Sequence, residues 1–219
     1  MYYHDILVGD SRARGLYDNW ALGFLGVDYV VYKRGATILD LAGPAGVAVS
    51  KAVTTSRRPV RVILAAGIND LSYRLRHGEV VFDESRNHVL HIEVALREFE
   101  IRVRHHGCEK VVFATISPMD FGWWNAISRS HGRVRDLDYS EYYPDMQQSF
   151  VETLRQVNSA IIEMNIRRQS PTPMLHFDVV DARGHEKQRV TWTRLVDGLH
   201  PTGETIDLWT KRLNIVLPR

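Results

Sequence analysis

Short, almost wholly apolar runs alternate along the chain with segments whose apolar residues recur every three or four positions. The apolar runs predict buried strands at residues 2–8, 27–32, 60–66, 110–116 and 174–179. The amphipathic segments predict helices at residues 11–25, 38–54, 88–106, 144–168 and 202–213. Strands joined by helical crossovers form a parallel sheet with both faces covered. The pattern therefore predicts one α/β domain over residues 1–219, a flavodoxin-like three-layer αβα sandwich around a five-stranded parallel sheet.

Three stretches interrupt this pattern. Gly43-Pro44 predicts a break inside the second helix, and residues 71–87 are polar and irregular. Residues 119–143 have no clear periodicity, yet they are too rich in aromatic side chains for a disordered segment. Because this segment follows the fourth strand, it leaves the sheet at the carboxyl edge. We interpret it either as a lid or pocket wall or as a packed excursion that covers the edge of the sheet.

Polar residues and glycines follow several of the predicted strands. Asp10 and Ser11 come directly after the first strand, Gly35 follows the second, and a Gly-Ile-Asn-Asp run at 67–70 follows the third. An Asp-Gly-Leu-His run at 197–200 comes just before the last helix. Because the carboxyl ends of parallel strands meet at one edge of a sheet, we expect these residues to converge there.

These residue types are the set that acyl transfer needs. Ser11 is the candidate nucleophile, and His200 is the candidate base that removes its proton. Asp197 would accept a hydrogen bond from the other ring nitrogen of His200 and fix its tautomer. The backbone N–H groups of Ser11 and Gly35 and the side-chain amide of Asn69 would stabilise the oxyanion. The sequence therefore predicts a Ser-His-Asp hydrolase site.

Each motif alone also has a structural interpretation. Ser11 or Asp10 could cap the helix that follows, and Asn69-Asp70 could form a turn. Asp70 is interpreted as a structural residue that ties down the loop around Asn69. His105-His106 is interpreted as a pair of surface side chains, because no further ligand lies beside it at metal-site spacing.

The four runs together resemble the SGNH hydrolases, also called GDSL esterases and lipases. That family combines Gly-Asp-Ser near the amino terminus, a glycine after the second strand, Gly-x-Asn-Asp after the third and Asp-x-x-His near the carboxyl terminus. This chain matches them in order at residues 9–11, 35, 67–70 and 197–200. The resemblance implies an αβα fold, a triad of Ser11, Asp197 and His200, and neither a metal nor a cofactor. Arg12 stands where the family usually has leucine.

The resemblance also implies a reaction and a class of partner. A carboxylic acyl or acetyl ester would be hydrolysed through an acyl-enzyme on Ser11. The substrate would be a small-molecule, lipid or carbohydrate ester, and Asp10, Trp123 and Trp124 are candidates for its pocket.

The amino-acid composition bears on the size of the core, the class of partner and the cellular location. The 219 residues are 44% hydrophobic, which is enough for a sizeable core. The net charge of +2 argues neither for nor against a nucleic-acid partner, but only scattered arginines favour one, so we do not expect it. There is no apolar run long enough for a transmembrane helix, no signal peptide is visible, and Cys108 is the single cysteine. These features predict an intracellular, cytoplasmic location.

A second hypothesis keeps the fold without the activity. SGNH-like domains also resemble the esterase domain found in first-open-reading-frame proteins of some retrotransposons. The chain would then be a binding or assembly module with weak or no esterase activity. Labelling by a serine-reactive fluorophosphonate distinguishes the two hypotheses.

Overall fold

A four-stranded parallel sheet forms the centre of the molecule. The computed structural model describes residues 2–134, 143–176 and 194–217. Within them the sheet has the order β2-β1-β3-β6. Its strands are β1 (His4–Gly9), β2 (Tyr29–Tyr32), β3 (Val60–Ala65) and β6 (Lys110–Phe113). Ile6 of β1 lies opposite Val62 of β3, and both side chains are fully buried, as in a sheet with both faces covered.

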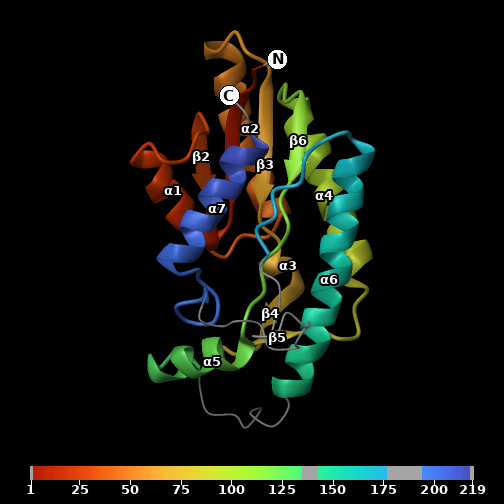
Figure 1. The fold of residues 1–219 in the computed structure, drawn as a ribbon. Coiled ribbons are helices and arrows are strands. Elements are labelled where there is room, and N and C mark those ends of the chain that lie inside the picture. Colours follow the sequence, from red (N-terminus) through yellow and green to blue (C-terminus); the bar gives the residue numbers. More distant parts are fainter. Residues whose placement is uncertain (1, 135–142, 177–193, 218–219) are drawn as a thin grey trace, which may run out of the picture.

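Helices cover both faces of this sheet (Figure 1). The longer ones are α1 (Arg14–Ala21), α2 (Ala42–Thr55), α4 (His88–His105), α6 (Tyr143–Arg167) and α7 (Gly203–Val216). From β1 the chain moves one way to β2 and then back past β1 to β3, so right-handed crossovers place α1 and α2 on opposite faces. On those faces α1 packs with α7, and α2 packs with α4. The prediction of a three-layer αβα fold is confirmed. Among the described helices, none combines the length and the apolar character needed to span a bilayer.

Two segments without apolar periodicity nevertheless form regular structure. Residues 71–87 contain an antiparallel hairpin and residues 119–143 contain a helix, so both stretches were wrongly predicted to be irregular. The hairpin is β4 (Ser72–Arg74) with β5 (Val80–Phe82), and the helix is α5 (Phe121–Ser130). Asp120 caps α5 by accepting a hydrogen bond from the Trp123 N–H at 2.8 Å. Residues 135–142 lie outside the described part of the chain.

The predicted break at Gly43-Pro44 is also wrong. A 3₁₀ turn, η2 (Leu39–Leu41), leads directly into α2, which runs unbroken from Ala42. Gly43 and Pro44 therefore fall in the first turn of the helix, where backbone N–H groups have no intrahelical partner. A proline there removes no hydrogen bond.

The predicted fifth strand at residues 174–179 is not found in the described chain, and the sheet has four strands. Two asparagines of α6 occupy the outer edge of β6 and of the segment after it. Asn165 accepts from the Phe113 N–H and donates to its carbonyl at 3.1 and 2.7 Å. Asn158 pairs with the N–H and carbonyl of Ile116 in the same way, at 2.7 and 2.9 Å. Helix side chains thus satisfy edge groups that a neighbouring strand would otherwise pair.

The segment that approaches this edge cannot form a regular ladder. Pro173 accepts a hydrogen bond from the Thr115 N–H at 3.0 Å, but a proline has no N–H to return. The Leu175 N–H bonds to the Thr115 hydroxyl at 2.7 Å and to the Pro173 carbonyl of its own segment at 3.2 Å, and neither is a ladder bond between strands. Residues 177–179 of the predicted strand lie outside the described part.

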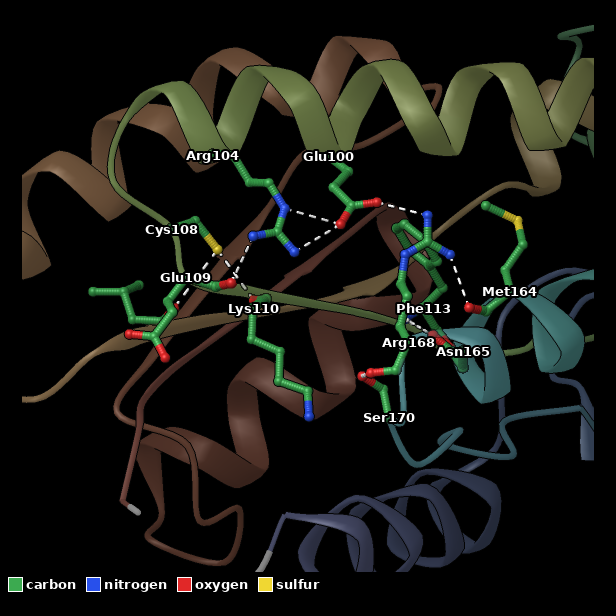
Figure 2. Close-up of polar contacts among 11 residues, drawn as sticks. Glu100, Arg104, Cys108, Glu109, Lys110, Phe113, Met164, Asn165, Arg168 and Ser170 are labelled. Atoms are coloured by element: carbon green, nitrogen blue, oxygen red, sulfur yellow. Dashed lines mark hydrogen bonds and ion pairs between the residues drawn. The ribbon is translucent and has the colours of Figure 1, made fainter.

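Charged side chains fasten α4 to the end of α6 beside this edge (Figure 2). Glu100 accepts from Arg104 at 2.9 Å and from Arg168 at 2.7 Å. Cys108 lies nearby, and its thiol contacts the Lys110 carbonyl at 3.1 Å. Burial raises the pKa of the Cys108 thiol to about 11, so it stays protonated and unreactive at neutral pH.

Candidate functional site

The turn after β1 places Ser11 at the carboxyl edge of the sheet. Ser11 begins a 3₁₀ turn, η1 (Ser11–Ala13), that runs into α1. Asp10 is its N-cap, and the Asp10 carboxylate accepts from the Arg12 N–H at 2.9 Å. The turn folds tightly over Gly9, where a Cβ would lie 2.4 Å from the Cβ of Ala13. Glycine is therefore required before Asp10 and Ser11 for this turn to form.

Arg12 is buried and crosses the rim of the sheet. Its guanidinium donates to the carbonyl and hydroxyl of Ser117 at 2.5 and 2.6 Å and to the Pro118 carbonyl at 3.1 Å. Burial lowers the pKa of Arg12 to about 10, although attraction to Asp10 and Asp197 opposes this. Burial also raises the pKa of Asp10, and Arg12 offsets part of that change. Arg12 therefore joins the turn that carries Ser11 to the chain that follows β6.

The run at 197–200 forms a turn in which the acid and the histidine bind each other. The Nδ1 of His200 lies 2.7 Å from Oδ2 of Asp197, and Oδ1 accepts from the N–H groups of Leu199 and His200 at 3.0 and 2.7 Å. Burial raises the pKa of Asp197, but these hydrogen bonds together bring it below its ordinary value. Asp197 is therefore ionised at neutral pH, and Nε2 of His200 has no hydrogen-bond partner among the described residues.

Helix α5 packs on this turn. The Asp120 N–H donates to the Gly198 carbonyl at 2.7 Å. Gly198 has a φ of +83°, and a Cβ there would lie 2.7 Å from the Trp124 backbone nitrogen. The Trp124 ring meets the His200 ring edge to face with centroids 5.7 Å apart. The aromatic segment thus contacts the candidate base directly.

One cavity of about 590 Å³ brings most of the candidate residues together. Ser11, Gly35, Asn69 and His200 all line it, and so does Trp124. Within the described residues, no hydrogen bond joins the Ser11 hydroxyl to His200, and the N–H groups of Ser11 and Gly35 have no partner. These groups are therefore free to bind a ligand.

Three other candidates do not line this cavity. Asp197 is connected to it only through its hydrogen bond to His200. Asp10 lies against a small neighbouring cavity. Trp123 is half-buried and packs against the hydrophobic core. Across the described residues, no group of three His, Cys, Asp or Glu side chains could hold a metal ion.

Residues 69 and 70 hold the loop that contains Gly35. The Asn69 amide donates one N–H to the Ala36 carbonyl at 2.9 Å, which fixes the orientation of its side chain. The Asp70 carboxylate accepts from the Ile38 N–H at 3.0 Å. Two hydrogen bonds from adjacent residues therefore set the position of the loop after β2 relative to β3.

Sequence comparison finds no family model and no curated protein that matches the chain. Solved structures do match it. A GDSL-like lipase from Bacteroides thetaiotaomicron is 14% identical, with 97% of this chain and 86% of that one covered and a TM-score of 0.58. A member of the lipolytic protein G-D-S-L family from Veillonella parvula is 15% identical, with 98% of both chains covered and a TM-score of 0.60. This chain has the GDSL fold.

The sequence alone did not indicate every residue that contributes to the candidate site. It gave no role to Arg12 or to the hairpin, yet Ser72, Arg74 and Val80 of the hairpin line the cavity. The apolar residues at 80–82 were a local signal for a strand. No local signal shows that Arg12 contacts residues 117 and 118, because that pairing depends on the tertiary fold.

Asp70 makes stability depend on pH in a way that one substitution tests. Burial, with smaller effects from Asp10 and Asp40, raises the pKa of Asp70 to about 7, above its value in the unfolded chain. The stabilising effect of its proton is full below pH of about 4 and is lost as the pH rises through about 7. Asp70→Asn keeps an acceptor for the Ile38 N–H, and its neutral amide avoids the free-energy cost of burying an ionised carboxylate. We expect this variant to be more stable than wild type by at least about 2 kcal/mol above that window.

Urea unfolding of both proteins across this pH range measures the effect. Asp40→Asn is the matched control, because hydrogen bonds from Thr37 lower the pKa of Asp40. The control should show no such gain as the pH rises. Parallel stability curves for wild type and Asp70→Asn would contradict the account.

Proposed function

We propose that this chain is a serine ester hydrolase of the SGNH kind. One observation carries the proposal: a single cavity is lined by Ser11 and by His200, whose Nδ1 is bound to Asp197. Gly35 and Asn69 line the same cavity. The fold shared with two lipolytic proteins supports the same class of reaction.

In the proposed reaction, the Ser11 Oγ attacks the carbonyl carbon of an ester while Nε2 of His200 takes its proton. The protonated His200 then gives this proton to the departing alcohol oxygen, and the acyl group remains on Ser11. A water molecule, deprotonated by the same Nε2, then attacks the acyl carbon. His200 returns this proton to the departing Ser11 Oγ, and the acid is released. Asp197, whose hydrogen bonds lower its pKa, stays ionised and stabilises the imidazolium.

The negative charge on the carbonyl oxygen needs donors that are already in place. The N–H groups of Ser11 and Gly35 and the second N–H of the Asn69 amide would supply them. Because the first amide N–H of Asn69 is held by the Ala36 carbonyl, the second needs no reorganisation during the reaction. Loss of one such donor typically costs about 3–4 kcal/mol of transition-state stabilisation.

The cavity suits a substrate of modest size. Its volume of about 590 Å³ lies within the range of small-molecule sites, about 300–1,000 Å³. Apolar side chains such as Ile68, Met119 and Ile206 form part of its wall. An acyl or acetyl ester of a small molecule, a lipid or a carbohydrate is the proposed substrate class.

A fluorophosphonate probe tests the proposal. The probe should phosphonylate the Ser11 Oγ with loss of fluoride, and mass spectrometry should place the adduct on the peptide that contains Ser11. Ser72→Ala is the control, because Ser72 lines the same cavity but donates its hydroxyl to the Ile68 carbonyl at 2.9 Å. This variant should be labelled like wild type, and denatured protein should not be labelled.

Folded protein that stays unlabelled, or an adduct on another serine, would contradict the assignment of Ser11. In that case the binding or assembly module becomes the better hypothesis.

A further inference from the structure

Four exposed arginines line the candidate catalytic cavity. They come from four separate places in the fold: Arg14 begins α1, Arg34 follows β2, Arg74 ends β4 and Arg133 follows α5. Segments far apart in the sequence thus each bring an arginine to the same opening. They are distinct from the buried Arg12, whose two terminal nitrogens donate to residues 117 and 118.

None of these four side chains has a hydrogen-bond or ion-pair partner within the described residues. Many exposed arginines elsewhere in the chain do. Four of them each form an ion pair with a glutamate one helical turn away. These arginines are Arg97, Arg102, Arg104 and Arg167. Exposed arginines without a partner among the described residues also occur elsewhere, for example Arg57, Arg76 and Arg155. The cavity differs because four such side chains line one opening.

The positive charge at the cavity is local. Among the described lining residues, Asp18 is the only acid, whereas the whole chain has a net charge of just +2. Like charges held around one opening repel each other, and a bound anion relieves that repulsion. A cleft with one sign of charge also concentrates oppositely charged ligands. Guanidinium groups match carboxylate and phosphate oxygens through paired N–H donors.

We propose that this cavity selects esters that carry an anionic oxygen group near the scissile carbonyl. Arg14, Arg34, Arg74 and Arg133 bind that group while the ester carbonyl lies at Ser11. The inference rests on the proposed hydrolase function and adds the charge of the substrate to it. It does not require a lipid or a sugar, since any acid or alcohol part with a carboxylate or phosphate has the chemistry that the cavity recognises.

Matched pairs of esters test the proposal. The para-nitrophenyl monoester of adipic acid is compared with para-nitrophenyl hexanoate, which places the charge on the acyl side. Para-acetoxybenzoate and para-acetoxyphenyl phosphate are compared with phenyl acetate, which places a carboxylate or a phosphate on the alcohol side. We expect kcat/KM to favour the anionic ester by about tenfold or more in at least one pair, and added salt to reduce the preference.

Substitutions then connect the preference to the arginines. Arg74→Gln should reduce the ratio of anionic to neutral kcat/KM by about tenfold. Arg57→Gln is the control, because Arg57 is exposed in the turn before β3, at the opposite edge of the sheet from Ser11. The control should keep the wild-type ratio. A ratio of one or less in all pairs, or a ratio that Arg74→Gln leaves unchanged, would overturn the inference.

A binding measurement separates this inference from the proposed function. Calorimetry follows binding of the mono-anilide of adipic acid, an amide analogue of the anionic ester, to wild type and to Arg74→Gln. Binding that depends on Arg74, in a protein that neither turns over esters nor is labelled at Ser11, supports the anion site and contradicts the hydrolase. Turnover without any anionic preference contradicts the anion site and leaves the hydrolase in place.

Discussion

Replacing Ser11 by alanine is expected to lower kcat for a short-chain aryl ester by about a millionfold, because the attacking oxygen is removed. The substitution should leave the fold intact. The Ser11 hydroxyl has no hydrogen bond within the described residues, and Asp10, not Ser11, caps η1. Urea unfolding should therefore give the same midpoint for both proteins. Equal hydrolysis by wild type and by Ser11→Ala would contradict the nucleophile.

A double variant tests whether Ser11 and His200 act as one unit. If His200 only removes the Ser11 proton, each single variant loses nearly everything that the pair supplies. Ser11→Ala/His200→Ala should then be about as slow as Ser11→Ala alone. A double variant whose loss is the product of the two single losses would show that the two residues act independently.

The core of the fold was predictable because its strands are continuous apolar runs. Residues such as Ile6, Leu7 and Val8 are fully buried, as expected for a short, continuous apolar run in a strand whose two faces are covered. The convergence of the candidate site residues, which lie far apart in the sequence, was predictable for a related reason. Parallel strands end at one edge, so residues after different strands line one cavity.

Apart from the break predicted at Gly43-Pro44, the errors involve one physical feature: buried asparagines make contacts that a pattern of apolar residues does not reveal. On α5 the buried face is Phe121, Asn125 and Ser128, which has helical spacing but one apolar member. Asn125 pairs with the N–H and carbonyl of Val80 at 2.9 and 2.8 Å, as Asn158 and Asn165 of α6 pair with the chain at β6. A side-chain amide supplies one donor and one acceptor to one strand residue. Hydrophobic periodicity cannot detect such a partner.

The substitution with the largest expected effect on stability is Arg12→Met, which should lower the free energy of unfolding by about 3–5 kcal/mol. Methionine has similar bulk but leaves the Ser117 and Pro118 carbonyls without their donor. It also removes the positive charge that opposes the effect of burial on Asp10. Because protonation neutralises Asp10, the loss should become smaller as the pH falls.

Urea unfolding of Arg12→Met and Arg14→Met measures this effect with a matched control. Arg14 is exposed and has no partner within the described residues, so its replacement should change stability by no more than about 0.5 kcal/mol. Equal effects at the two positions would contradict the structural role of Arg12. A loss confined to Arg12 would explain why this chain tolerates arginine where the SGNH motif that it resembles usually has leucine. The guanidinium fastens the turn that carries Ser11 to the chain beyond β6, which an apolar side chain cannot do through hydrogen bonds.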